Sequence, residues 1–147
     1  MVNYYLITAV LAVINLFVLI FIFEPKKTNY YFMILMLLFA LTNGAYLAIA
    51  VSTSLEEAVL ANKISYLGGC FMPPIILFLI CAICNYTIRP WLRCLLYTYS
   101  AVVYFSVLTI GYSNIYYDRI YLEKFMDATV LGHTYGPAHK LFYVILY

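Results

Sequence analysis

The chain has 147 residues, of which 67% are hydrophobic, 19% are aromatic and only 10% are charged. A soluble domain carries about 25% charged residues and about 45–50% apolar ones, so this composition excludes a water-soluble globule and predicts a surface that faces lipid. The net charge of +2 comes from scattered residues, which excludes a basic nucleic-acid-binding patch and an acidic tail. The length permits one domain, residues 1–147.

The first predicted element is a membrane span over residues 3–23, which are apolar except for Thr8 and Asn15. About 20 residues at about 1.5 Å each cross a hydrocarbon core of about 30 Å. The N-terminus lacks the positive start and the cleavage site of a secretory signal, so we expect this segment to be kept as an anchor. A short turn with a proline and two lysines leads to a second span over 30–51, which begins with interfacial tyrosines.

A third helix is predicted over residues 55–86, because Ser54 and Glu57 form a capping box just before an apolar run. At about 1.5 Å per residue this helix would be roughly 45–50 Å long, so its polar first turns should lie outside the lipid. Two glycines and two prolines should then kink or unwind it. A hinge or pocket wall is the functional interpretation, and a static kink needed for packing is the alternative. The hinge residues are Gly68, Gly69, Pro73 and Pro74.

A fourth span is predicted over 92–111, followed by the longest polar connection of the chain. Within it, "RIYLEKF" (119–125) and "ATVLGHTY" (128–135) are β-prone and predict a short hairpin. Residues 137–147 begin a fifth span but would cover only about 15 Å, so we expect the chain to be the front part of a longer membrane protein. The predicted fold class is therefore all-α: a polytopic membrane helix bundle with four full spans, the start of a fifth and a small hairpin.

The orientation follows from basic residues near the ends of the spans. Lys26, Lys27, Arg89 and Arg93 are dense in the two short turns, whereas the other basic residues are spread thinly. Since cytoplasmic turns are enriched in lysine and arginine, the sequence predicts a multi-pass protein of the cell membrane with an extracytoplasmic N-terminus.

Several polar or small residues in the spans are candidates for contacts. Ala40, Gly44 and Ala48 recur at four-residue steps, which predicts close helix packing in lipid. Asn43 beside them is either an interhelical hydrogen-bonding residue or a ligand contact. Lys63 either extends to the interface or binds an anionic or carbonyl-bearing signal. The candidate ligand-binding residues are Asn43, Tyr46, Lys63 and Tyr66.

Catalytic and metal-binding patterns were not found in the sequence. His133 and His139 are six residues apart with a Gly-Pro break between them, which is not helical ligand spacing. Cys81 and Cys84 form a C-x-x-C within an apolar helix, where small packing residues are the simpler interpretation. We therefore expect a chain that is not an enzyme and that holds no metal or cofactor.

Two stretches, "LEEAVLANKISYLGGCFMPP" and "YGPAHKLFYVILY", resemble the N-terminal seven-transmembrane sensor region of bacterial histidine kinases and diguanylate cyclases. The resemblance rests on a small residue in an outer polar turn, an aromatic-Leu-Gly element, a following proline and a Tyr-Gly-Pro before the fifth span. In this chain these are Ala58, Tyr66-Leu67-Gly68, Pro73 or Pro74, and Tyr135-Gly136-Pro137. The chain covers about the first two-thirds of that region, which implies that spans six and seven and a cytoplasmic output domain follow.

The predicted function is thus a transmembrane input domain that regulates a downstream histidine kinase or diguanylate cyclase in bacterial two-component or related signal transduction. Its predicted partners are the lipid bilayer, a small-molecule or membrane signal and the output domain, with a homodimer left open and no nucleic acid. A fragment of a small-molecule transporter and a scaffold that binds other membrane helices are the alternatives.

Overall fold

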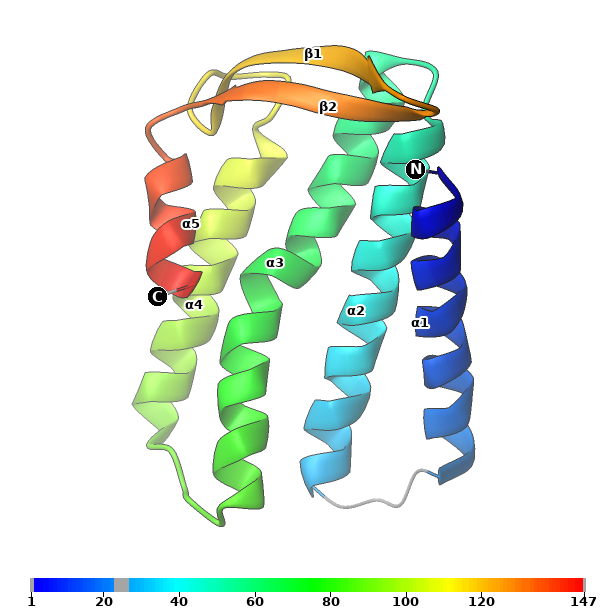
Figure 1. The fold of residues 1–147 in the computed structure, drawn as a ribbon. Helices are drawn as coiled ribbons and strands as arrows, with labels where there is room; N and C mark the ends of the chain where they lie inside the picture. The colour runs from blue at the N-terminus through cyan, green and yellow to red at the C-terminus, as the bar shows by residue number, and fades with distance from the viewer. Residues whose placement is uncertain (1, 23–26, 147) are drawn as a thin grey trace.

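The chain forms a bundle of antiparallel helices with a β-hairpin lying across one end (Figure 1). The computed structural model describes residues 2–22 and 27–146, with side chains described for 2–17 and 30–144. The elements in chain order are α1 (Val2–Ile22), α2 (Lys27–Val51), α3 (Leu55–Ile83), α4 (Pro90–Leu108), β1 (Tyr117–Phe125), β2 (Ala128–Tyr135) and α5 (His139–Leu146). A helical bundle and the small hairpin are as the sequence predicts.

The prediction of four full spans and the start of a fifth is supported only in part. In the described chain, the helices long and apolar enough to cross a membrane are Tyr30–Val51, Leu55–Ile83 and Pro90–Leu108. The described apolar stretch of α1 is Val2–Phe17, and α5 has eight residues. The structure therefore supports a multi-pass membrane protein with three membrane-capable helices, and it does not confirm the larger number.

Two helices end earlier than the sequence predicts, because the backbone turns at their ends. α3 stops at Ile83, where Asn85 takes a φ of +54° and the Tyr86 N–H donates to the Cys81 carbonyl over 2.8 Å. Asparagine tolerates this left-handed conformation at a helix end better than most residues. α4 stops at Leu108, and Gly111 with a φ of +87° turns the chain toward the hairpin.

The start of α3 confirms the predicted capping box. The Ser54 hydroxyl accepts a hydrogen bond from the Glu57 N–H over 3.3 Å, and a Glu57 carboxylate oxygen accepts from the Ser54 N–H over 3.3 Å. The same oxygen accepts from the N–H of Thr53 over 3.0 Å. These bonds satisfy backbone donors that a helix start leaves unpaired.

The interruption in the middle of α3 has two components with different physical origins. Figure 1 shows α3 changing direction about halfway along its length. Pro73 and Pro74 lie inside this helix, and they remove the backbone donors for the carbonyls of Gly69 and Cys70. Gly68 serves a packing role, since a Cβ there would clash with the Thr42 hydroxyl of α2 and lie 3.3 Å from the Leu38 carbonyl oxygen.

The best-packed core lies at the hairpin end of the bundle. Val107 at the end of α4, Ile110 just after that helix and Tyr116 before β1 are each 0% exposed. They form one cluster with buried residues of α2, α3 and both strands: Ile49, Ala58, Val59, Ala61, Tyr117 and Leu131. The hairpin is therefore part of the hydrophobic core and not an appendage of it.

The tip of the hairpin is fastened to two helices. Phe125 pairs with Ala128, which leaves Met126 and Asp127 as a two-residue turn. The Asp127 carboxylate accepts from the Val2 N–H of α1 over 3.3 Å. Thr129 donates its hydroxyl hydrogen to the Ser52 carbonyl, just after α2, over 2.9 Å.

The turn residue Met126 gives a first prediction. Its φ of +56° costs a residue with a Cβ roughly 1 kcal/mol, and glycine is preferred at this position when only the first central residue has positive φ. Met126→Gly should therefore raise the free energy of unfolding by up to about 1 kcal/mol. Thermal unfolding in detergent, followed by circular dichroism, measures this. Met126→Ala is the control, and an equal gain for alanine would contradict the explanation.

Two glycines of adjacent helices give a second prediction. Gly68→Ala should destabilise the fold by about 1–3 kcal/mol, because the added methyl group overpacks the contact with Thr42. Gly44→Ala should not destabilise the fold and should raise the free energy of unfolding by up to about 1 kcal/mol through the higher helix propensity of alanine, since a Cβ on Gly44 meets no described atom within 4 Å. Denaturant titration in mixed micelles compares the two. Adding Thr42→Ala to Gly68→Ala should restore part of the loss, and equal losses at both glycines would be inconsistent with this packing.

Candidate functional site

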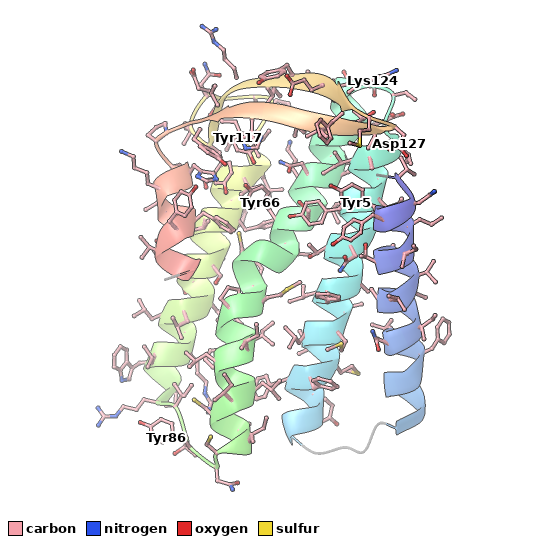
Figure 2. All side chains as sticks on the ribbon, viewed as in Figure 1. Tyr5, Tyr66, Tyr86, Tyr117, Lys124 and Asp127 are labelled. Atoms are coloured by element: carbon pink, nitrogen blue, oxygen red, sulfur yellow. The ribbon has the colours of Figure 1, made fainter. Side chains whose placement is uncertain are left out.

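A cavity of about 370 Å³ lies beneath the hairpin, between the helices. Its walls come from α1, α2, α3, both strands and α5, which are distant in the sequence. Figure 2 shows Tyr5 of α1 and Tyr66 of α3 below the strands, with Tyr117 of β1 close to Tyr66. The cavity is within the volume range of about 300–1,000 Å³ typical of small-molecule sites.

One side of the cavity is formed by a cluster of aromatic rings that joins the hairpin to α3 and α5. The Tyr66 and Tyr117 hydroxyl oxygens are 2.8 Å apart and share a hydrogen bond. The Tyr117 ring stacks on His133 with centroids 4.1 Å apart, and Tyr135 stacks on His139 at 3.9 Å. We call these five residues the aromatic cluster. It connects four elements through one set of ring contacts.

Three hydroxyl groups of the cavity are satisfied within the protein. The hydroxyls of Thr42, Ser65 and Thr129 donate to the carbonyls of Leu38, Asn62 and Ser52 over 2.9, 2.8 and 2.9 Å. Asn62 differs, because its side-chain Nδ2 makes no hydrogen bond of adequate geometry within the described residues although the residue is only 8% exposed. A buried donor without a partner costs free energy and is a common feature of binding sites.

The electrostatic character of the cavity is neutral. Among the described side chains that line it, none is a carboxylate, an ammonium or a guanidinium group. Burial raises the pKa of Tyr117 and of the adjacent Tyr116 above the ordinary tyrosine value. These two phenols therefore stay protonated and can donate hydrogen bonds at neutral pH.

The structure brings only two of the four candidate ligand residues to this cavity. Tyr46 and Tyr66 line it. The Asn43 amide instead donates to the Phe39 carbonyl of its own helix over 2.8 Å. The Lys63 ammonium lies 4.8 Å from the centroid of the Tyr112 ring, beside a separate hollow of about 430 Å³. Asn43 and Lys63 are not among the described residues that line the cavity.

Several lining residues were not among the candidates from the sequence. Asn62 is four residues before Tyr66 and seven before Gly69, so all three share one face of α3, and this spacing could have identified the face. Tyr117 and His133 come from the hairpin, whose position over the helix ends has no local sequence signal. Gly69 lines the cavity as well, where a Cβ would be 3.3 Å from the Phe142 ring of α5.

The small-residue stripe faces away from the other described helices. Gly44 and Ala48 are exposed, and a Cβ on Gly44 meets no described atom within 4 Å. α2 instead buries Leu38, Ala45 and Ile49. Close packing through Ala40, Gly44 and Ala48 thus remains a prediction for segments outside the described chain.

Metal binding has no geometric basis in the part of the chain that the structure describes. No group of three or more histidine, cysteine, aspartate or glutamate side chains there could hold a metal ion. The four cysteines are free thiols, and Cys70 is fully buried. His133 and His139 belong to the aromatic cluster, where their rings stack on tyrosines.

The described chain is thus a lipid-facing helix bundle with a neutral cavity beneath the hairpin at one end. The family profile described as the N-terminal 7TM region of histidine kinase matches residues 6–147. The chain therefore belongs to this family, as its sequence resemblance implies. No curated protein and no solved structure matches the chain significantly.

The hydroxyl pair in the aromatic cluster gives a third prediction. Tyr66→Phe and Tyr117→Phe each remove one partner of the 2.8 Å hydrogen bond, so a double-mutant cycle should show a coupling of about 0.5–1.5 kcal/mol. Denaturant titration in mixed micelles supplies the four unfolding free energies. Tyr86→Phe, at the opposite end of the bundle (Figure 2) and 68% exposed, is the control. Additive losses for Tyr66 and Tyr117 would show that the pair is not coupled.

Proposed function

We propose that this chain is the signal-input domain of a bacterial membrane protein and that it regulates a cytoplasmic histidine kinase or diguanylate cyclase domain. The observation that carries the proposal is the cavity, whose walls include residues of both α3 and α5. It lies in a chain that belongs to a family of membrane regions of histidine kinases. In this proposal the chain itself performs no catalysis. It binds the signal and passes a change in helix packing onward.

The contact between α3 and α5 supplies the route for that change. Phe142 of α5 packs edge-on against Tyr66, with ring centroids 5.1 Å apart, and lies directly against Gly69. Gly69 is four residues before Pro73, so this contact is at the bend of α3. An occupant that touches Tyr66, Gly69 and Phe142 would favour one packing of α3 against α5 over another. It shifts the equilibrium only by its difference in affinity for the two packings.

The proposed orientation places the hairpin end outside the cell. The hairpin, the Ser52–Ser54 turn and the start of α1 lie at one end of the bundle, and the turn with Arg89 lies at the other (Figure 1). Arg89 and Arg93, together with Lys26 and Lys27 in the sequence, support a cytoplasmic location for that second end. The cavity would then be accessible to a signal from the outer side.

Transport is not favoured by the same observations. A pathway for ions or polar substrates is expected to be lined by ionisable residues at membrane depth. The described lining of the cavity has no carboxylate, ammonium or guanidinium group, and its imidazole, His133, stacks on Tyr117 in the hairpin, so we do not propose a transporter.

The proline pair gives a fourth prediction, which tests the proposed function. Replacing Pro73 and Pro74 by alanine restores two backbone donors and should straighten α3. In the full-length protein, reconstituted in lipid vesicles, we expect basal phosphorylation or cyclic dinucleotide synthesis to change by about threefold or more. Radiolabelled nucleotide incorporation measures it.

Leu95→Ala is the matched control, since Leu95 is exposed on α4 and lies outside both the bend and the cavity. Unchanged output of the proline variant would remove the role of the α3 bend in signalling. A full-length protein without any kinase or cyclase domain would contradict the proposed function itself.

A further inference from the structure

We propose that the cavity beneath the hairpin binds an uncharged, largely apolar molecule that carries a carbonyl group, and that Asn62 donates a hydrogen bond to this carbonyl. The inference rests on the proposed function, because it takes the cavity as the signal site and names the chemical class of the signal. Three properties of the cavity carry it: its walls, its unused donors and its lack of charge.

The walls are suited to an apolar body. Rings from four different helices and from the hairpin surround the space, including Tyr5, Tyr46, Tyr66 and Phe142. Met72 adds a flexible thioether, which adapts to irregular shapes and packs well on aromatic groups. Apolar surface that leaves water for such walls gains free energy in proportion to its area. The volume of about 370 Å³ allows a small molecule and not a folded peptide.

The buried donors that stay unused are suited to one acceptor, whereas the hydroxyls of Tyr5, Tyr46 and Tyr135, which also line the cavity, belong to half-buried or exposed residues. The hydroxyls of Thr42, Ser65 and Thr129 are occupied by backbone carbonyls, so they have no hydrogen left to offer. Asn62 Nδ2 is buried and makes no hydrogen bond of adequate geometry within the described residues. In the Tyr66–Tyr117 pair one hydroxyl donates to the other, so the accepting hydroxyl keeps its own hydrogen.

These two donors lie on one wall of the cavity, because Asn62 is one helical turn before Tyr66 on α3 and the Tyr66 and Tyr117 hydroxyl oxygens are 2.8 Å apart. A carbonyl oxygen has two lone pairs and can accept from both donors at once. An alcohol or an ether would also accept, but a carbonyl is the stronger acceptor for an amide N–H. The arrangement therefore selects for a ketone, ester or amide.

The absence of carboxylate, ammonium and guanidinium groups from the described walls disfavours ionised ligands. A carboxylate or ammonium group in this space would lose its hydration and meet no opposite charge among the described lining residues, which is strongly unfavourable. Lys63, the charge nearest in sequence, lies over the Tyr112 ring beside a different hollow. An anionic signal is thus the main alternative, and the experiment must distinguish it from an uncharged signal.

The experiment uses benzophenone, an uncharged aromatic ketone that forms covalent adducts with nearby C–H bonds under near-ultraviolet light. The full-length protein in lipid nanodiscs is irradiated with benzophenone or with its carboxylate analogue, 4-benzoylbenzoate. Mass spectrometry then locates the adducts. Labelling of Met72, Val130 and Phe142, which line the cavity, is divided by labelling of Val102 and Phe105, which are exposed on α4.

We expect this ratio for benzophenone to exceed that for the carboxylate by about fivefold or more, since the site offers hydrogen bonds but no countercharge. Asn62→Leu replaces the amide by an apolar side chain of similar size and so removes the donor. It should lower the benzophenone ratio by about fivefold. Asn15→Leu, which changes an exposed asparagine of α1 outside the cavity, is the matched control and should leave the ratio unchanged. Tyr117→Phe removes the second donor and serves if Asn62→Leu fails to fold.

Adding dioleoylglycerol to the nanodiscs separates two sources of this chemistry. Loss of cavity labelling would assign the site to an uncharged membrane lipid, and unchanged labelling would assign it to a free solute. Equal ratios for the two probes, or full labelling in both donor variants, would overturn the proposal. The readout does not depend on the output domain, so a failure here combined with altered output of the proline variant would leave the proposed sensing function intact.

Discussion

The hairpin and the helices form one folding unit because two consecutive tyrosines are buried where they meet. Tyr116 is 0% exposed and Tyr117 is 4% exposed, and both belong to the core formed by the ends of α2, α3 and α4. The return of the chain reinforces this contact, since the N–H groups of Gly136 and Ala138 donate to the carbonyls of Tyr116 and Ile115 over 2.8 and 2.9 Å. These bonds bring α5 against α3 and complete the walls of the cavity.

The glycines of α3 control how closely the neighbouring helices approach. Gly68 allows α2 to come close through Thr42, and Gly69 allows the Phe142 ring of α5 to come close on another side. The prolines that follow them bend the helix. Tight contacts at the glycines and a wider space under the hairpin therefore occur on the same helix, within about two turns of each other. This is a suitable place for a small ligand to alter helix packing.

The chemistry of the cavity limits what it can recognise. Without a charged group in its described lining, it discriminates by shape and by one or two hydrogen bonds. In the proposed role such a site would gain little from electrostatic attraction of a distant ligand, and its occupants would be apolar molecules that also concentrate in the membrane. Selectivity would come from the cost of leaving Asn62 unpaired, since an occupant without an acceptor cannot recover that donor.

The sequence alone determined the membrane class, the approximate helix positions, the capping box at Ser54 and the hairpin, because each depends on local composition or on residues a few positions apart. It also identified Tyr66 as a candidate ligand-binding residue. Only the tertiary structure decided that Tyr46 and Tyr66 share a cavity while Asn43 and Lys63 do not, and that Gly44 is exposed while Gly68 is a helix contact. The reason is physical: the direction in which a helix face points depends on which elements cover it, and here the covering hairpin and α5 come from more than 50 residues further along the chain.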